Sequence, residues 1–363
     1  MWSAIAGTLL GTVSGFIPGL HPNNLIPFFF FFPDPGMFAV SFYASHAISV
    51  PFQSIFLGVS SDANALAIMP GHKLALKGKG LLAFKQASGT AFFVVLSSPV
   101  FILLYQFMLP VYSSFKLLIL LFLTILLAHM LAGRKILVTL LAGALGILCA
   151  DYSMLFPMLS GFFGASTLLL SMKTESLPRQ KEKEQSIVYR NVFLSQASAF
   201  FFAIVPGASA GIAAAFSRVF GRIKKEEYVS SVAGISAAYT MFSIYTLDVY
   251  GITRSGLAVF LKPLNMSLLA SVGVAVFSAG IAFPLSLMLA ERACRNIHHM
   301  QYSLIAGSSF TLLFAMVFAF TGSLGIIVFI TSTSIGLLAA SMHVRRINCM
   351  SAIIIPVLLR ALI

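Results

Sequence analysis

The stretches SGFIPGLHPNN (residues 14–24) and FAIVPGASAG (residues 202–211) each place a Pro-Gly pair inside an apolar, uncharged segment. Proline removes a backbone hydrogen bond from a helix, and glycine lets the chain open without steric cost. Within a bilayer, such an interruption persists only where protein or water satisfies the freed backbone groups. The two stretches therefore predict two broken, re-entrant helices, and they set the interpretation of the remaining sequence.

The composition is that of an all-α, polytopic integral membrane protein. Hydrophobic residues make up 59% of the 363 residues and charged residues 9%, with a mean hydropathy of +0.97, whereas soluble domains carry about 25% charged residues. Several uncharged stretches reach the roughly 20 residues that cross a bilayer as a helix. They are residues 1–33, 35–61, 86–115, 191–217, 228–247, 263–290 and 300–342.

The net charge of +13 lies in short loops between these apolar runs, as the positive-inside rule expects for cytoplasmic loops. This distribution predicts contact with anionic lipid headgroups rather than with nucleic acid. The three cysteines have no metal-ligand spacing, so we expect neither a metal site nor a cofactor. The predicted location is the cell membrane, as a multi-pass protein.

A charged stretch, KTESLPRQKEKEQSIVYRN, divides the chain into a first membrane repeat (1–172), a cytoplasmic linker (173–191) and a second membrane repeat (192–363). Pro18 and Pro206 are 188 residues apart, and Asp62 and Asp248 are 186 apart, which indicates an internal duplication. The first repeat offers spans near 37–57, 89–109, 117–133, 136–152 and 154–171. The second offers spans near 228–247, 263–290, 302–319, 325–342 and 347–363. Five spans per repeat is an odd number, so the second copy is predicted to be inverted, as in many secondary transporters.

A half-helix that starts after a break points free N–H groups and a positive dipole end inward, which favours an anion. In the first break Pro22 suits the first helical position, and His21, Asn23 and Asn24 add polar side chains. In the second, Ser209 suits a helix cap, and Gly207 permits close backbone approach. We expect two such ends to form an anion site at the bilayer midplane; the competing interpretation is a pair of simple kinks.

Ionisable residues near the membrane supply further candidates. Asp62 and Asp248 are expected either to couple transport to Na⁺ or H⁺ or to lie in surface loops. Arg254 either clamps a carboxylate or phosphate or reaches to the interface as an amphipathic side chain. His46, inside an apparent span, is expected to bond to a neighbouring helix, and the run Phe28–Phe32 is interpreted as facing lipid.

No enzyme signature emerges: the sequence has neither HExxH nor a phosphate-binding GxxxxGK[ST], and no GxSxG with a plausible aqueous elbow. We therefore expect a transporter of an anionic substrate, most simply a small carboxylate, and not an enzyme. Two alternatives stay open. One is a carrier of an isoprenoid (polyprenyl) lipid phosphate, and the other is a membrane-embedded lipid-modifying enzyme using His21, Asp62 and Asp248 for acid–base work.

The segments SGFIPGLHPNN, MPGHKLALKGKGLLAFKQASGTAF and AIVPGASAGIAAAFSRVFGR together resemble the TctA family, the large permease subunit of tripartite tricarboxylate transporters. This chain resembles a shortened and divergent member. The resemblance implies a permease for carboxylates, driven by an ion gradient, with a solute-binding protein and a small membrane subunit as partners. The substrate-facing candidates that it implies are Pro18, Gly19, Asn23, Asn24, Pro206, Gly207 and Ser209.

Overall fold

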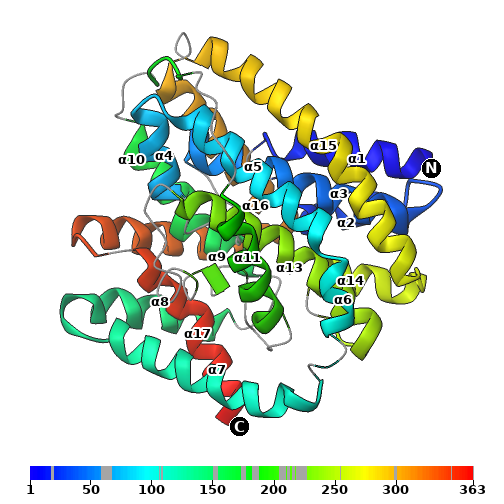
Figure 1. The fold of residues 1–363 in the computed structure, drawn as a ribbon. Helices are drawn as coiled ribbons and strands as arrows, with labels where there is room; N and C mark the ends of the chain where they lie inside the picture. The colour runs from blue at the N-terminus through cyan, green and yellow to red at the C-terminus, as the bar shows by residue number, and fades with distance from the viewer. Residues whose placement is uncertain are drawn as a thin grey trace.

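The structure is a computed structural model that describes all residues except 18–19, 59–67, 106, 108, 150–153, 173–176, 182–187, 204–209, 211–212, 215–216, 218–226, 254, 298–300, 345 and 363. The described residues form helices and no strand (Figure 1). The all-α fold class predicted from the long apolar runs is therefore confirmed.

The first half of the chain holds α1 (Trp2–Ser14), α2 (Pro22–Phe29), α3 (Pro35–Ser49), the π-helix η1 (Gln53–Leu57), α4 (Ile68–Leu76), α5 (Gly80–Ser97), α6 (Val100–Tyr105), α7 (Leu109–Met130), η4 (Gly133–Lys135), α8 (Ile136–Leu148), α9 (Leu155–Leu159), the π-helix η6 (Ser160–Ala165) and α10 (Ser166–Ser171). The second half holds α11 (Tyr189–Phe202), α13 (Tyr228–Tyr250), α14 (Gly256–Leu261), η7 (Lys262–Leu264), α15 (Leu268–Asn296), α16 (Tyr302–Ser341), η9 (Arg346–Met350) and α17 (Ser351–Leu362).

Four helical segments among the described residues are long and apolar enough to cross a membrane. They are Gly80–Ser97, Tyr228–Tyr250, Leu268–Asn296 and Ala306–Ser341. The pair Leu123–Met130 and Gly133–Leu148, bent by 99°, makes a fifth if it counts as one broken span. Several of the other predicted spans fall on shorter helices, so the count of ten remains a prediction.

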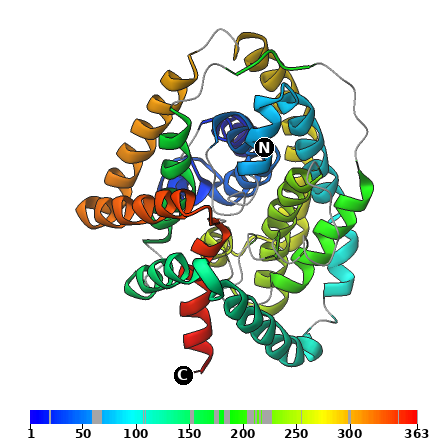
Figure 2. The same cartoon turned by 90° about the vertical axis from the view of Figure 1, so that its left-hand side faces the viewer.

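Helix α16 contains an internal break at Gly322, whose φ of 62° and ψ of −157° are not helical. Glycine accepts this positive φ without the steric penalty that a side chain brings. Figure 2 shows the two arms of α16, in orange and red-orange, running in different directions from the bend. The break lies between the spans predicted at 302–319 and 325–342.

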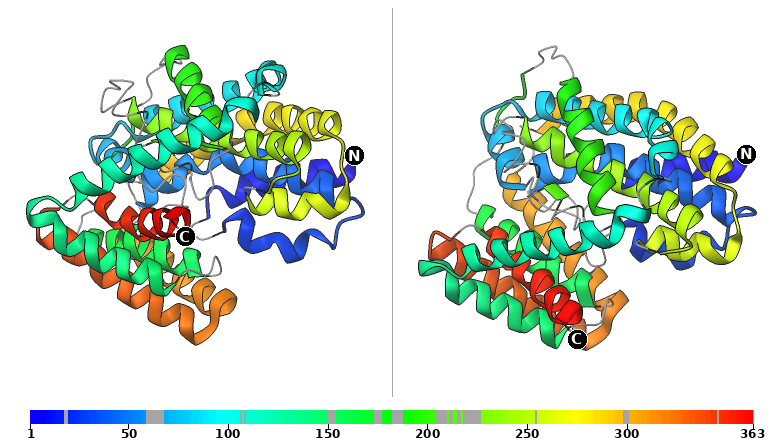
Figure 3. Two further views of the ribbon diagram at one scale, coloured as in Figure 1. Left: turned by 90° about the horizontal axis from the view of Figure 1, so that it is seen from below. Right: turned by 60° about the horizontal axis from the view of Figure 1, so that its bottom comes forward.

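The helices form two packing groups that do not coincide with the two halves of the sequence. The break-side group consists of α1, α3, α5, α11, α13 and α15, and the C-terminal group consists of α7, α8, α9, η6, α10, α16 and α17. Figure 3 shows the C-terminal group at one side of the molecule and α1, α3 and α15 at the other. Each group takes helices from both halves, so the halves interlock.

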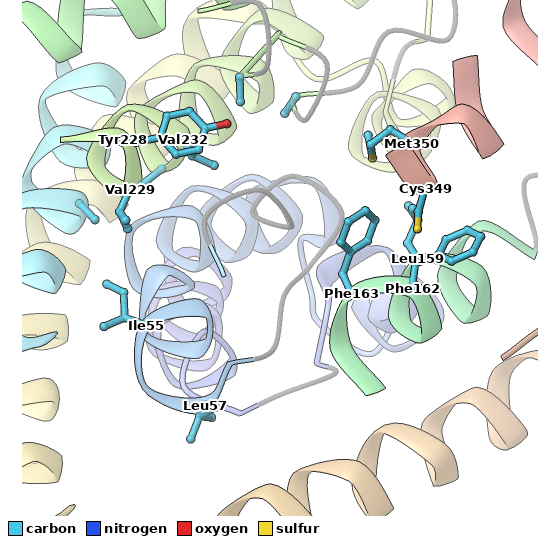
Figure 4. Close-up of a cluster of buried hydrophobic side chains, with 14 of the residues drawn as sticks. Ile55, Leu57, Leu159, Phe162, Phe163, Tyr228, Val229, Val232, Cys349 and Met350 are labelled. Atoms are coloured by element: carbon cyan, nitrogen blue, oxygen red, sulfur yellow. The ribbon is translucent and has the colours of Figure 1, made fainter. Parts of the chain in front are cut away.

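A buried apolar cluster joins the two groups. Figure 4 shows Ile55 of η1 on the side of Tyr228 and Val229, which begin α13, while Phe162 of η6 lies beside Cys349 of η9. Within a membrane such side chains stabilise the fold through van der Waals packing rather than through removal from water. The two π-helices, η1 and η6, therefore both contribute to the core at this junction.

Candidate functional site

Helix α1 ends at Ser14, four residues before Pro18. A proline has no N–H to donate to the carbonyl four residues earlier, so the sequence itself frees the Ser14 carbonyl oxygen. The Ser14 oxygen accepts the Ile17 N–H at 3.2 Å, and the side chain of Gln53 adds a second donor: its Nε2 donates to the Ser14 oxygen at 3.1 Å and to the Ile17 oxygen at 2.9 Å. The end of α1 is thus capped by an amide from η1. Pro18 and Gly19 lie outside the described residues.

Helix α1 approaches α3 closely because glycines recur at every fourth position of its contact face. A Cβ added at Gly7 would lie 2.5 Å from the Phe38 carbonyl oxygen, and one at Gly11 would lie 2.4 Å from that of Phe42. Small residues at this spacing let two membrane helices pack backbone to backbone. This contact holds the end of α1 against the C-terminal half of α3.

The chain resumes as α2 with His21 as its N-cap and Pro22 in its first turn, which confirms the predicted position of Pro22. His21 Nδ1 accepts a hydrogen bond from the Asn23 backbone N–H at 3.2 Å. Asn23 Oδ1 accepts one from the Tyr43 hydroxyl of α3 at 2.5 Å. Asn24 follows within α2. The first break is therefore bounded by an ordered helix start that is tied to α3.

His46 of α3 lies beside the same break and is 5% exposed. Its Nδ1 is 2.8 Å from the Ser14 hydroxyl oxygen, and its ring centroid is 5.8 Å from that of His21, edge to face. The expectation that His46 bonds to a neighbouring helix is confirmed. We call Ser14, His21, Asn23, Tyr43, His46 and Gln53 the first-break cluster.

Hydrogen bonding within the first-break cluster leaves donors of His21 and Asn23 unoccupied. Asn23 Oδ1 accepts from Tyr43, and the carbonyls of Ser14 and Ile17 accept from Gln53. His21 Nδ1 is also an acceptor, so a neutral His21 carries its proton on Nε2. No described residue accepts from that N–H or from the Asn23 amide group, and the Asn23 side chain is exposed. The cluster therefore offers donors, the groups that bind an anion.

The second half of the chain reaches this break through the start of α14. A Cβ added at Gly256 would lie 2.4 Å from Asn23 Oδ1, and Ser255 caps α14 while donating to the Ser243 hydroxyl of α13 at 2.9 Å. Arg254 lies outside the described residues. The two halves thus meet where the first break opens.

The second Pro-Gly pair follows a helix of nearly the same length. α11 has 14 residues and α1 has 13, and α11 ends at Phe202, four residues before Pro206. It packs on α13 through polar side chains: Asn191 Nδ2 donates to the Ser230 hydroxyl at 2.8 Å, and Ser195 Oγ lies 3.2 Å from the Ser231 carbonyl oxygen. Pro206, Gly207 and Ser209 lie outside the described residues.

Of the two candidate coupling carboxylates, Asp62 lies outside the described residues. Asp248 is exposed in the last turn of α13. No group of three or more His, Cys, Asp or Glu residues that could hold a metal occurs in the part of the chain that the structure describes.

One expectation near the site is wrong in part. Within the run Phe28–Phe32, Phe28, Phe30 and Phe31 are exposed, but Phe29 is 1% exposed and packs against Phe38, Phe42, Tyr43 and Phe260. A helical turn carries side chains to every side, so one residue of a short aromatic run turns inward. Phe29 anchors α2 to α3 and α14.

Sequence reasoning missed Gln53 and Tyr43 because their partners are 20 or more residues away. Gln53 did carry a signal, as a lone amide in an uncharged apolar stretch that must find a partner in the membrane. The spacing of Gly7, Gly11 and Gly15 carried another.

The apolar helices and the polar broken-helix cluster define a multi-pass membrane protein of the transporter class. The sequence model of the tripartite tricarboxylate transporter TctA family matches residues 1–351, and the chain belongs to this family of membrane permeases. It is 27% identical over 394 residues to an uncharacterized protein of Methanocaldococcus jannaschii, covering 98% of this chain and 97% of that protein. No solved structure matches it.

Proposed function

We propose that the protein moves a small carboxylate across the cell membrane by alternating access around its two Pro-Gly breaks. The observation that carries this proposal is the hydrogen-bond pattern of the first-break cluster, in which Asn23 and His21 keep their donors unoccupied. A carboxylate accepts such donors, and charge-assisted hydrogen bonds are about twice as strong as neutral ones. The family match favours this transport over lipid-phosphate carriage or enzymatic chemistry.

The second break is proposed as the other wall of the same site, formed by Pro206, Gly207 and Ser209 with Arg254. Two features support a duplicated arrangement, whose second copy is proposed to be inverted. α1 and α11 each end four residues before a Pro-Gly pair, and each packs against the next long helix, α3 or α13. The proposed topology has ten spans and two hairpins. The break-side group and the C-terminal group each contain helices from both halves. In the proposed alternating access, these two groups move relative to each other.

We further propose that Asp62 or Asp248 contributes to Na⁺ or H⁺ coupling, and that a solute-binding protein and a small membrane subunit deliver the substrate. Tripartite transporters of this family include both partners. Asp248 is three residues before Gly251, where α13 ends with a positive φ, so it lies next to the loop that leads to α14 and Asn23.

Uptake of labelled citrate, succinate and related carboxylates into proteoliposomes, with and without a Na⁺ or pH gradient, tests the proposal. We expect gradient-stimulated uptake of at least one carboxylate. Pro18→Ala and Gly207→Leu should abolish it while the protein still inserts, whereas Gly280→Ala, on an open face of α15, should leave it unchanged. Absence of uptake across the panel, together with movement of a polyprenyl phosphate in the same vesicles, would replace this proposal by the lipid carrier.

A further inference from the structure

His46 contains a buried ring nitrogen without a partner. Ser14 Oγ lies 2.7 Å from the Gly11 carbonyl oxygen and 2.8 Å from His46 Nδ1. The Ser14 hydroxyl has one proton, so both bonds form only if Ser14 donates to Gly11 and His46 Nδ1–H donates to Ser14. Nε2 of a neutral His46 is then an acceptor, and it is buried with no hydrogen-bond partner.

An unsatisfied buried acceptor costs about 1–3 kcal/mol, so its presence at the break needs a reason. The ring of His21 lies 5.8 Å away, centroid to centroid, and its Nε2–H is an unoccupied donor. One unoccupied donor and one unoccupied acceptor on adjacent rings match a protonated carboxyl group. One carboxyl oxygen accepts from His21, and the single added proton joins the other oxygen to His46 Nε2, where it resides on the nitrogen in the bound pair.

We infer that His21 and His46 together bind one carboxyl group of the substrate with one proton, so that His46 carries a coupling proton. The inference rests on the proposed carboxylate transport and deepens it. A carboxylate and one proton from water enter the site, and the proton resides on His46 Nε2. The resulting imidazolium then donates to one carboxylate oxygen while His21 donates to the other. On release, the proton and the carboxylate leave together, and His46 returns to its neutral form.

His21 is the titratable group whose charge would act on His46, and two positive rings so close would repel each other, so His21 stays neutral and donates while His46 alone carries the proton. The other described charges on helices packed against α3 are Lys85 on α5, Asp248 on α13, and Glu291, Arg292 and Arg295 on α15. Lys85 and Glu291 pair with each other at 2.6 Å. An unpaired charge in the membrane interior is costly. Bringing the proton and carboxylate in as a pair avoids that cost.

The test measures protons taken up when citrate binds the full-length protein in nanodiscs, by titration calorimetry in two buffers of different ionisation enthalpy. Near neutral pH the wild type should take up one proton more per citrate than His46→Gln, and His129→Gln, an exposed histidine on α7, should match the wild type. Equal proton uptake by wild type and His46→Gln would overturn the inference, as would a wild type that does not bind citrate.

A second measurement uses only the wild-type protein, so it does not depend on whether a histidine variant folds. In wild-type protein labelled with ¹⁵N-histidine, citrate should protonate one imidazole Nε2 that is unprotonated in chloride of equal ionic strength. No such change would also overturn the inference. Carboxylate uptake without a His46-dependent proton would leave the proposed function standing and remove this one. If citrate binds together with the His46-dependent proton but no carboxylate is taken up, this inference stands and the proposed transport function is removed.

Discussion

The two Pro-Gly units share a plan and differ in their chemistry. Each has a helix of 13 or 14 residues that ends four residues before the proline and packs against the following long helix. In the first unit the contact is made by Gly7, Gly11 and Gly15, with almost no side chain between the backbones. In the second it is made by Asn191 and Ser195, which hydrogen-bond across the interface. Close approach and polar bonding are thus two solutions to holding a half-membrane helix in place.

The largest loss of folded protein is expected when the close glycine contact between α1 and α3 is disrupted. In Gly11→Leu the new side chain would meet the backbone of Phe42, whose carbonyl oxygen lies 2.4 Å from the added Cβ. Backbone cannot move aside as a flexible side chain can, so we expect loss of most folded protein, measured as the monodisperse fraction after solubilisation. Gly280→Leu, with nothing within 4 Å of its Cβ, should retain it. Normal folding of Gly11→Leu would show that α1 does not need this contact.

The next largest effect concerns the capped end of α1. Gln53→Met removes the side-chain donor to both the Ser14 and Ile17 carbonyls. Each carbonyl keeps one backbone N–H bond, from Ile17 and Leu20 respectively, so the two lost hydrogen bonds together cost about 1–3 kcal/mol. We expect a clear drop in thermal stability in detergent and reduced transport. Gln301→Met, at an exposed position before α16, is the matched control. Equal stability of the two variants would mean that water satisfies the break.

A moderate effect is expected in the second unit. Asn191→Leu removes hydrogen bonds to the Glu227 carbonyl at 3.2 Å and the Ser230 hydroxyl at 2.8 Å. Ser230 also bonds the Glu227 carbonyl, which softens the loss to about 1–2 kcal/mol. Thermal unfolding should show a smaller decrease than for Gln53→Met, and Asn296→Leu, exposed at the end of α15, should show none. A decrease larger than that of Gln53→Met would reverse the ranking of the two units.

The smallest effect is expected at the ion pair between the halves. Lys85 on α5 and Glu291 on α15 are partly exposed, at 29% and 39%, and such pairs contribute about 0–1 kcal/mol. Lys85→Met should lower stability slightly at low salt and not at high salt. A large, salt-independent loss would instead indicate that the Lys85 stem packs as part of the core.

The sequence predictions that the structure confirms rest on local rules. Apolar run length gave the helices, and the preference of proline for a first helical turn placed Pro22 after a cap at His21. The sequence did not reveal the capping of Ser14 by Gln53 or the burial of Phe29, because both depend on how distant segments meet. The division into two repeats stays a prediction, and the sequence did not indicate that helices of both halves pack together. Periodicity along a chain does not specify which faces pair.

The most direct test of substrate passage between the breaks uses single cysteines at Asn23→Cys and Ser209→Cys, with the buried Cys149, Cys294 and Cys349 replaced by alanine. Each is treated with a charged, membrane-impermeant thiol reagent from both sides of proteoliposomes, with and without the transported carboxylate. We predict that both cysteines react from water and that the carboxylate slows both reactions. Cysteines that do not react from either side, or that react at the same rate with substrate present, would contradict the account.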